Sequence, residues 1–490
     1  MIEQAIENLI QFEINHGIIT DRDITYVRNQ IYHLVQLTFD ETKNIAPKDI
    51  MYPNDALDVI LDDLEKRKIL DGSQIARDLF DAKIMNIFAD KPSVVAYMFD
   101  KIYQNNRRDA MLWYYEYAKN LNYIRMDRIH KNKSFIAHTS SGDLQITINL
   151  SKPEKDPKSI AMQANQVSTN YPKCVLCIEN EGFSGHATRQ SRDQHRMIKF
   201  KLNGKNWYFQ YSPYIYYNEH AIVISEKHTP MVINEETFRD LCLLVDKFDG
   251  YFFGSNADLP IVGGSILSHS HYQGGIHDFP IEKADAFYEE TYKDYQLQLL
   301  KWPLSTIKLI SKDKDVLIKK ATSILNSWKA YENKDLDIIA YTNQIRHHTI
   351  TPVVKKVDDM YHMYLILRDN HTTDKHPLGI FHPHQDVWHI KKENIGLIEA
   401  IGLAILPKRL VKELDAVKQY VKYDTKLPKE FNKHLHWAND IKKDYQKHMD
   451  IDQFIEKMVG MRFERVLVDC GVFKLNKDEQ TMISFIKGEK

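Results

Sequence analysis

The chain has 490 residues, of which 43% are apolar, as is ordinary for a globular protein of about two or three domains. The 66 Lys and Arg nearly cancel the 67 Asp and Glu, so nothing indicates a polyanion-coating protein, and nucleic acid is not an expected partner. No run of about 18 apolar residues occurs, and the first residues lack a basic leader, so we expect a cytoplasmic protein without a membrane partner.

Residues 1–133 are predicted to form a helical N-terminal region. Apolar residues recur at helical spacing from Ile2 to Ile10, and Gly17 would end this helix. Thr20-Asp21-Arg22-Asp23 is a typical start signal, after which the spacing resumes from Ile24 to Val35. This region shows no catalytic constellation, so we interpret it as a scaffold or an interface module. Further helices are expected over 75–88 and 109–119.

Short strands are predicted from residue 134 onward. Leu144–Leu150 alternates, and Asn203-Gly204 between Met197–Leu202 and Asn206–Tyr211 is a strong hairpin signal. A strand over Ala221–Ser225 precedes a helix that Asn234 could cap and that runs to about Phe248. Strands interrupted by single helices indicate α+β order, and neither G-x-G-x-x-G nor a Walker sequence occurs.

The later part of the chain is predicted to repeat this order. A helix over Val316–Tyr331 precedes strands over Thr349–Val357 and Met360–Arg368, which are joined at Asp358-Asp359. A helix is then expected from about Lys392 to Leu406, ended by Pro407. An internal duplication is therefore a fair hypothesis, with a catalytic half over 134–304 and a second half over 305–490 that has lost the catalytic role.

The most informative stretch is His269-Ser270-His271-Tyr272-Gln273, set between Gly263-Gly264 and Gly274-Gly275. Side chains two apart share a strand face, so His269, His271 and Gln273 would line one surface. A neutral imidazole can act as a nucleophile at neutral pH, because its ordinary pKa is about 6.5. Glycines let backbone N–H groups approach phosphate oxygens closely. The motif predicts a histidine nucleophile for phosphorus, with a metal site or a His-rich hairpin as the alternative.

Cys174 and Cys177 form a C-x-x-C pair, and four cysteines in so long a chain argue against a disulfide framework. Thiolate and imidazole together suit tetrahedral zinc, and the two missing ligands would come from His220, His228 and His269. A reduced pair without metal is the alternative; a redox pair is disfavoured because the segment lies outside any βαβ unit. His382, His384 and His389 could form a second metal site. The simpler interpretation is that they are exposed loop histidines.

Longer strings make a family resemblance specific. The order of elements resembles that of the histidine-triad superfamily: a strand between His220 and His228, then a helix, then His-x-His. In the uridylyltransferase branch of that superfamily, Gln replaces the third histidine of the motif, and position 273 is Gln. Over essentially the whole chain, the sequence is similar to the second family of galactose-1-phosphate uridylyltransferases. The strings that carry this similarity are 146–157, 208–220, 260–275, 379–384, 394–399 and 402–410.

The resemblance implies an α+β fold in which duplicated histidine-triad-like antiparallel sheet halves, with helices, follow the helical N-terminal region. It also implies a two-step exchange. UDP-glucose uridylylates the enzyme and releases glucose 1-phosphate, and galactose 1-phosphate then takes the uridylyl group to give UDP-galactose. His271 would be the nucleophile, and Gln273 would hydrogen-bond the transferred phosphoryl oxygens. A neutral amide orients that group without activating water.

The pattern of the related first family implies a structural zinc ion. Its ligands would be Cys174, Cys177, His228 and His269. His220 is an alternative to His228 as one of these ligands. We expect UDP-sugar and hexose 1-phosphate as partners, and the helical N-terminal region could supply a homodimer interface. The candidates for substrate binding are Gly263, Gly264, Ser265, Asn218 and Arg196. Arg192 and Lys227 are further candidate cations, and the alternative is that these basic side chains belong to a solvated surface.

Two other functions remain open at this point. A histidine-triad phosphorylase or hydrolase for dinucleoside polyphosphates would share the nucleophile, but Gln273 and the long strings disfavour it. A non-catalytic, zinc-stabilised nucleotide-binding protein is the other alternative, and an intact His271 disfavours it.

Overall fold

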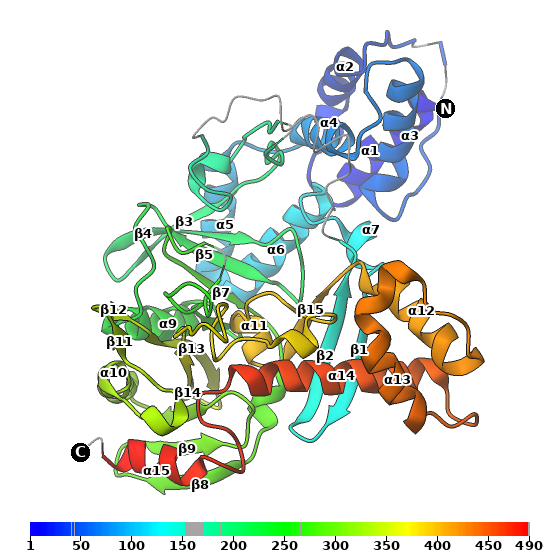
Figure 1. Ribbon diagram of the computed structural model, residues 1–490. Helices are drawn as coiled ribbons and strands as arrows, with labels where there is room; N and C mark the ends of the chain where they lie inside the picture. Colours follow the sequence, from blue (N-terminus) through cyan, green and yellow to red (C-terminus); the bar gives the residue numbers. More distant parts are fainter. Residues whose placement is uncertain (41, 44, 152–170, 187, 265, 489–490) are drawn as a thin grey trace. The chain divides into compact units, whose positions relative to one another are not determined.

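The computed structural model describes residues 1–40, 42–43, 45–151, 171–186, 188–264 and 266–488 (Figure 1). Contacts divide the chain into two compact units. The first comprises residues 1–131, 151–215 and 219–228, and the second comprises 132–150, 216–218 and 229–490. The predicted boundaries near 133 and 304 follow a repeated element order rather than compactness, so they remain a prediction. Within the described ranges, no helix is both long and apolar enough to cross a membrane.

The first unit begins with helices, as the sequence periodicity predicts. Thr20 and Asp23 form the expected capping interaction, in which the Thr20 backbone N–H donates to Asp23 Oδ2 over 3.0 Å. The first helix ends two residues before Gly17, which has a φ of +70°. The helices are α1 (Ile2–Asn15), η1 (Asp21–Asp23), α2 (Ile24–Leu34), α3 (Pro53–Lys66), α4 (Gln74–Asn86), α5 (Pro92–Asn105), α6 (Arg107–Asn120), α7 (Met126–Ile129) and η2 (Ile178–Asn180).

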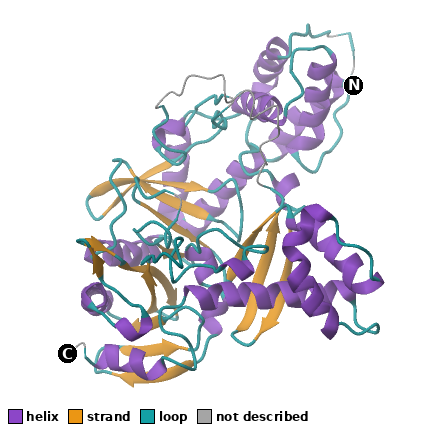
Figure 2. Cartoon of the chain, viewed as in Figure 1, coloured by secondary structure: helices purple, strands orange, loops and turns teal. Residues whose placement is uncertain are grey.

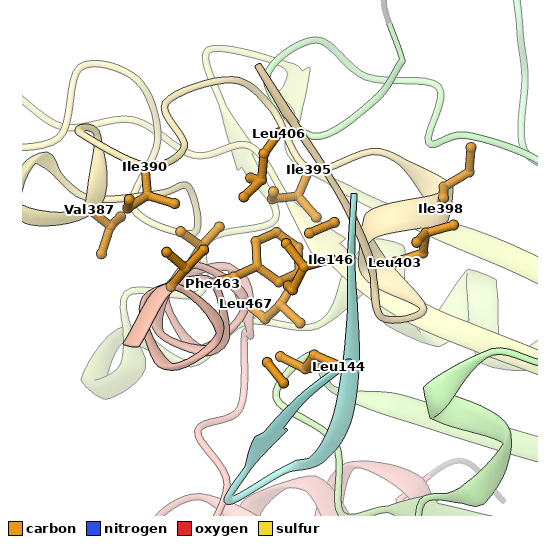
Figure 3. Close-up of a cluster of buried hydrophobic side chains, with 14 of the residues drawn as sticks. Leu144, Ile146, Val387, Ile390, Ile395, Ile398, Leu403, Leu406, Phe463 and Leu467 are labelled. Atoms are coloured by element: carbon orange, nitrogen blue, oxygen red, sulfur yellow. The ribbon is translucent and has the colours of Figure 1, made fainter. Parts of the chain in front are cut away.

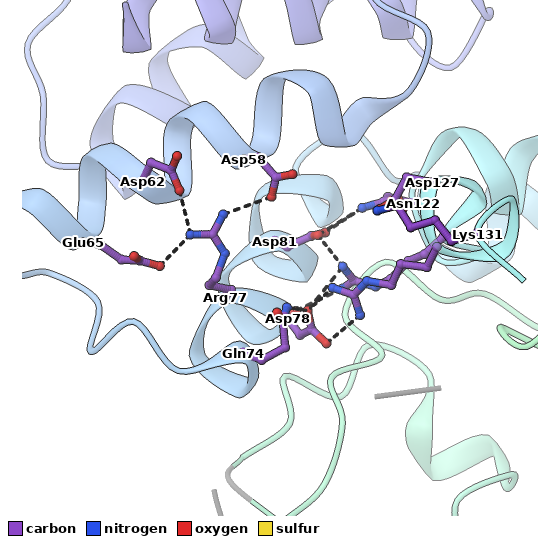
Figure 4. Close-up of polar contacts among 12 residues, drawn as sticks. Asp58, Asp62, Glu65, Gln74, Arg77, Asp78, Asp81, Asn122, Asp127 and Lys131 are labelled. Atoms are coloured by element: carbon purple, nitrogen blue, oxygen red, sulfur yellow. Dashed lines mark hydrogen bonds and ion pairs between the residues drawn. The ribbon is translucent and has the colours of Figure 1, made fainter. Parts of the chain in front are cut away.

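Ion pairs join the helices of this unit (Figure 4). Arg77 on α4 reaches three carboxylates of α3, and its shortest contact is 2.6 Å to Glu65. The buried carboxylate of Asp81 accepts from Arg125 over 2.6 Å and from the Asn122 side chain. Buried charges are tolerated where they are paired and hydrogen-bonded, so this cluster fixes α4 against the segment that follows α6.

The first unit also contains three antiparallel strands, β3 (Ile198–Leu202), β4 (Lys205–Tyr211) and β5 (Ala221–Ser225). The turn between β3 and β4 is the predicted one, and Asn203 and Gly204 both have positive φ, 47° and 75°. Such angles at two central residues are what a two-residue hairpin loop of type I′ requires. The prediction of this hairpin from Asn-Gly is therefore confirmed.

The second unit is built on an antiparallel sheet with the strand order β7-β6-β13-β14-β10-β9-β8. Asn234 caps α9 as predicted, since its side chain accepts from the Thr237 N–H. Asp358 and Asp359 form the predicted turn, with φ of 47° and 63°. The elements are β6 (Phe252–Gly254), β7 (His271–Gly275), β8 (Ala286–Thr291), β9 (Gln296–Leu300), β10 (Thr306–Ser311), β13 (His348–Val357), β14 (Met360–Asp369), α9 (Glu235–Lys247), η3 (Pro280–Lys283), α10 (Lys314–Ala330) and η4 (Lys334–Leu336).

A second, smaller sheet pairs β1 with β2 and β2 with β15, and a two-stranded hairpin joins β11 to β12. Figure 2 shows the helices that accompany these strands in the later part of the chain. The remaining elements are β1 (Lys133–Thr139), β2 (Gly142–Asn149), β11 (Tyr341–Thr342), β12 (Ile345–Arg346), β15 (Leu403–Pro407), η5 (Gln385–Val387), α11 (Leu397–Ala400), α12 (Leu410–Tyr423), η6 (Lys429–His434), α13 (Leu435–Asp444), α14 (Ile451–Cys470) and α15 (Glu479–Lys487).

The chain order of these elements repeats. Three strands, one helix and two strands occur as β3, β4, β5, α9, β6, β7 and again as β8, β9, β10, α10, β13, β14, where the short hairpin of β11 and β12 is inserted before β13. The α+β class and the antiparallel pairing expected from the sequence are confirmed. Only the first copy carries His-x-His-x-Gln, at the start of β7.

The predicted helix from Lys392 to Leu406 is wrong. Only Leu397–Ala400 is helical, and Leu403–Pro407 is strand β15, which pairs in parallel with β2. Gly402 has a φ of +108°, which ends the helix and turns the chain into the strand. The apolar run Leu403–Leu406 suits either structure, and the partner strand decides between them.

A hydrophobic core of the second unit includes side chains of β2, β15, α14 and the segment 387–398 (Figure 3). Leu144 and Ile146 of β2 face Phe463 and Leu467 of α14, and all four are 1% exposed or less. Burial of each such side chain contributes about 1.5–3 kcal/mol. This packing holds the segment 394–398, which takes part in the site described next.

Candidate functional site

The strand that carries the histidine motif begins at His271, so the predicted strand needs a correction. His269 lies in a bend before β7 and not on the strand itself. The Ser270 N–H donates to the carbonyl oxygen of Thr229 over 2.7 Å, and the Met231 N–H donates to Leu267 over 2.9 Å. The backbone before β7 is thus hydrogen-bonded to the segment after His228 and does not continue the pairing with β6.

The imidazole of His271 is buried and held in one orientation. Its Nδ1 lies 2.8 Å from the carbonyl oxygen of His269, and the side chain is 4% exposed. A carbonyl can only accept, so Nδ1 carries the proton and Nε2 keeps its lone pair in the neutral ring. Burial lowers the pKa of His271, and the bond to His269 opposes that effect. A neutral imidazole with a free Nε2 is the form that can attack phosphorus.

His271 and Gln273 lie on the face of the sheet opposite α9. Tyr272, which alternates with them, donates its hydroxyl to Asp240 Oδ2 on α9 over 2.9 Å. Gln273 pairs across the ladder with Gly254 of β6. Its Oε1 is buried and has no hydrogen-bond partner among the described residues. The amide is therefore available to a ligand beside His271.

The loop after β6 contains two glycines that pack tightly against their surroundings. A Cβ at Gly263 would lie 2.3 Å from the Ala257 carbonyl oxygen, and a Cβ at Gly264 would lie 2.8 Å from Asn256 Nδ2. Both positions therefore require glycine, because no side chain fits. Ser265, the third predicted residue of this loop, lies outside the described residues.

Asn256 and Asp258 are residues of this loop that the sequence interpretation missed. Asn256 Oδ1 accepts from the Leu397 N–H over 2.9 Å. Asp258 accepts from the Ile233 N–H over 3.0 Å and from Arg346 Nη2 over 2.9 Å, and the Thr349 hydroxyl donates to its other oxygen. Asp258 thus ties the loop to three other segments of the unit. The Asn-x-Asp spacing before Gly-Gly was the available signal.

Cys174 lies beside His228 in the first unit. One potential ligand atom of each side chain lies within 4.8 Å of the other. Cys177 donates its S–H to the Cys174 carbonyl oxygen over 3.3 Å, and this neighbouring thiol is the main cause that lowers the pKa of Cys174 to about 6. Of the two competing histidines, His228 is the one beside Cys174, whereas His220 precedes β5 and hydrogen-bonds the Tyr214 carbonyl oxygen.

His269 is completely buried in the second unit, and its backbone is linked to the segment that follows His228. The bond from the Ser270 N–H to the Thr229 carbonyl joins the residue after each histidine. Two thiols and two imidazoles are a donor set that zinc accepts. The second hypothetical metal site finds no such support, since the rings of His382, His384 and His389 hydrogen-bond to Asn394, Ile380 and His434 respectively.

The remaining candidate substrate residues have the following contacts within their own units. Asn218 lies at the far end of β7, where its carbonyl oxygen accepts from the Ile276 N–H over 3.0 Å. Arg196, in the first unit, donates to Asp90, Asp193 and His195 carbonyl oxygens and to Asn86 Oδ1, at 2.6–2.9 Å. These contacts use most of its five N–H donors, which favours a structural role. Arg192 contacts Ser191 and Gln190, and Lys227 is exposed.

The sequence matches two family descriptions in succession. "Galactose-1-phosphate uridyl transferase, N-terminal domain" matches residues 19–230, and the corresponding C-terminal domain matches residues 244–439. The chain belongs to the galactose-1-phosphate uridylyltransferase family.

Curated relatives of this family match along almost the whole chain. The galactose-1-phosphate uridylyltransferase of Clostridium perfringens is 46% identical over 485 residues, which cover 97% of each chain. The Streptococcus pneumoniae protein named galactose-1-phosphate uridylyltransferase 1 is 44% identical, with 96% of each chain covered. Among solved structures, yeast Ap4A phosphorylase Apa2 is similar over 63% of this chain and 90% of its own, with 11% identity and a TM-score of 0.36.

Proposed function

We propose that this protein is a UDP-glucose–hexose-1-phosphate uridylyltransferase of galactose metabolism, acting through a covalent uridylyl-histidine. The observation that carries the proposal is the orientation of His271, whose Nδ1 is bound to the His269 carbonyl. The free Nε2 is thereby the nucleophilic atom. Family membership and near-complete coverage by relatives that bear this name support the choice of reaction.

In the first step, Nε2 of His271 attacks the α-phosphorus of UDP-glucose. An N–P bond forms, the bond from this phosphorus to the bridging oxygen breaks, and glucose 1-phosphate leaves with that oxygen. In the second step, a phosphate oxygen of galactose 1-phosphate attacks the same phosphorus, the N–P bond breaks, and UDP-galactose leaves. The Nδ1 proton stays on the ring throughout, and the His269 carbonyl stabilises the positive charge that the ring carries while uridylylated.

Gln273 would donate its amide N–H to a non-bridging oxygen of the transferred group. Backbone N–H groups near Gly263, Gly264 and Ser265, with the Asn256 side chain, would bind the other phosphate oxygens. Asn256 is fixed for this role by Leu397, whose N–H occupies Oδ1, so that Nδ2 is the atom on the side of Gly264. We do not assign a substrate contact to Arg196.

A zinc ion bound by Cys174, Cys177, His228 and His269 is part of the proposal. The proximity of Cys174 to His228 and the hydrogen bond between Thr229 and Ser270 support Cys174, His228 and His269 as ligands, and Cys177 is included from the C-x-x-C spacing. Bound zinc would supply structural cross-linking rather than chemistry. It would hold the segment before β7, on which the orientation of His271 depends. We further propose a cytoplasmic homodimer in which the helical N-terminal region supplies the interface.

Intact-mass measurement tests the mechanism. After mixing with UDP-glucose alone, the protein should gain the mass of one uridylyl group, and His271→Ala should abolish the gain. His277→Ala is the matched control, since His277 follows the same strand but hydrogen-bonds Gln145; this variant should keep the adduct. Unchanged mass of the wild-type protein during continuing turnover would exclude the covalent mechanism. An adduct formed from a dinucleoside polyphosphate but not from UDP-glucose would favour a phosphorylase.

A further inference from the structure

Three polar side chains of the second unit have buried atoms without hydrogen-bond partners among the residues that the structure describes. These atoms are Gln273 Oε1, Thr351 Oγ1, and both Nε and Nη1 of Arg368. Thr351 is completely buried and Arg368 is 1% exposed. Leaving such groups unpaired destabilises a folded protein, so unpaired groups that occur together indicate a ligand.

The three side chains lie on the same face of the sheet as His271. Gln273 pairs with Gly254, Gly254 with Val353, and Val353 with Tyr364, and residues directly opposite in a ladder share a face. Alternation then places His271 on β7, Thr351 on β13, and Arg368 on β14 on this same face. Thr349 confirms the register, since it pairs directly with Arg368.

The positive charge of Arg368 has no bonded anion. Within the part of the chain that the structure describes, its one hydrogen bond is from Nη2 to the Ile395 carbonyl oxygen, over 2.9 Å. Glu399, the nearby carboxylate, forms an ion pair with Lys391 at 2.5 Å. Burial raises the pKa of Cys470, the other neighbour, to about 12, so its thiol is neutral at physiological pH. Because arginine stays charged in proteins, a buried site for an anion results.

Arg368 is connected to the glycine loop through one short segment. It donates to the Ile395 carbonyl, while Asn256 accepts from the Leu397 N–H two residues later. Strands lie about 4.8 Å apart, so β14 is roughly 14 Å from β7 at the backbone. His271 and Arg368 lie on the same face of the sheet, on either side of β6 and β13.

We propose that Arg368 binds the phosphate of the hexose 1-phosphate, with the Thr351 hydroxyl as a second donor to the same molecule. The proposal rests on the proposed function, in which this molecule is both the leaving group and the acceptor. Arg368 therefore serves both half-reactions. Arg196 is the contrasting case, a buried arginine whose donors are bound to protein oxygens.

Thermal unfolding of the full chain with and without glucose 1-phosphate tests the proposal, with inorganic phosphate as a second probe. Both probes should raise the melting temperature of the wild-type protein and should leave that of Arg368→Met unchanged. Without a probe, Arg368→Met should melt no lower than the wild-type protein, because it removes an unpaired buried charge. Arg196→Met, the matched control, should melt lower but keep the shift. The KM for galactose 1-phosphate should rise roughly 10- to 100-fold in Arg368→Met and less in Arg368→Lys.

The outcomes separate this site from the reaction. If Arg368→Met keeps the shift with glucose 1-phosphate, the site is wrong even where the wild-type protein forms the uridylyl adduct. If the shift depends on Arg368 but no adduct or transfer occurs, the site stands and the proposed reaction fails. A wild-type shift with glucose 1-phosphate but not with inorganic phosphate would overturn the phosphate assignment. If Arg368→Met does not fold, Arg368→Lys provides the test. A melting-temperature shift and a KM in Arg368→Lys equal to those of the wild-type protein would overturn the proposal.

Discussion

The carbonyl oxygen of His269 lies 2.8 Å from Nδ1 of His271 and determines which nitrogen of the nucleophile is free. The bond exists because His269 precedes the strand, where its carbonyl turns toward the ring instead of pairing with β6. His269 thus orients His271 through its backbone carbonyl, and the His269 side chain is a proposed metal ligand. The proposed zinc ion would fix that side chain, and with it the carbonyl that orients His271.

Replacement of Gln273 by His should convert part of the transfer into hydrolysis. An imidazole at this position can accept a proton from water, which the neutral amide cannot, and general-base catalysis typically contributes about 100-fold or more. The uridylyl adduct of Gln273→His should therefore decay much faster in the absence of a sugar phosphate, as followed by intact mass over time. Gln273→Ala is the control and should slow adduct formation without accelerating decay. Equal lifetimes in wild type and Gln273→His would contradict this role.

Protein purified without chelator should contain about one zinc ion per chain, measured by elemental analysis. His228→Ala and Cys174→Ser should lose most of it, because each removes a proposed ligand of a four-ligand site. His220→Ala should retain the metal, since that ring hydrogen-bonds the Tyr214 carbonyl. Cys242→Ser replaces a buried thiol of α9 and should also retain the zinc ion. Metal loss in His220→Ala but not in His228→Ala would reverse the assignment.

Asp258→Ala should destabilise the second unit and reduce transfer activity together. The substitution leaves the Ile233 N–H, Arg346 and the Thr349 hydroxyl without their acceptor, and removing one partner of a buried charge pair costs about 3–5 kcal/mol. Urea denaturation measures the loss. Thr349→Val removes one of these bonds and should cost only about 0.5–1.5 kcal/mol. A free energy of unfolding unchanged in Asp258→Ala would show that the carboxylate does not fix the loop.

Glu13 should make the first unit less stable as the pH rises. Its carboxyl group on α1 is completely buried, neither oxygen has a hydrogen-bond partner among the described residues, and burial raises its pKa well above the ordinary value. Above the ordinary pKa of about 4.3, the folded protein holds a proton that the unfolded chain has released, so the stability contributed by this group falls as the pH rises.

Glu13→Met should therefore be more stable than the wild-type protein at pH 7, by about 1–3 kcal/mol, and the difference should shrink toward pH 5. Urea denaturation at several pH values measures it. Glu3→Met on the same helix is the control; it removes a carboxylate that pairs with Lys43, and its effect should be small. A difference for Glu13→Met that stays constant with pH would rule out titration of this group as the cause.

Local sequence determined the elements whose signals are local. The Thr20–Asp23 capping interaction, the hairpin turns at Asn203-Gly204 and Asp358-Asp359, and the Asn234 cap each depend on a few neighbouring residues, and all occur as predicted. The His-x-His-x-Gln motif and the long family strings likewise identified the family and the candidate nucleophile. The sequence could do this because such signals need no partner far along the chain.

Only the tertiary structure decided what depends on distant partners. Leu403–Pro407 became a strand because β2, more than 250 residues earlier, offers an edge to pair with. Asp258 acquired its role from Arg346 and Thr349. Arg196 donates four hydrogen bonds to protein oxygens, whereas Nε and Nη1 of Arg368 have no partner among the described residues, although nothing in the residues around either arginine distinguishes them. Hydrogen-bond satisfaction and the shared face of a sheet are properties of long-range pairing, which short-range sequence preferences do not encode.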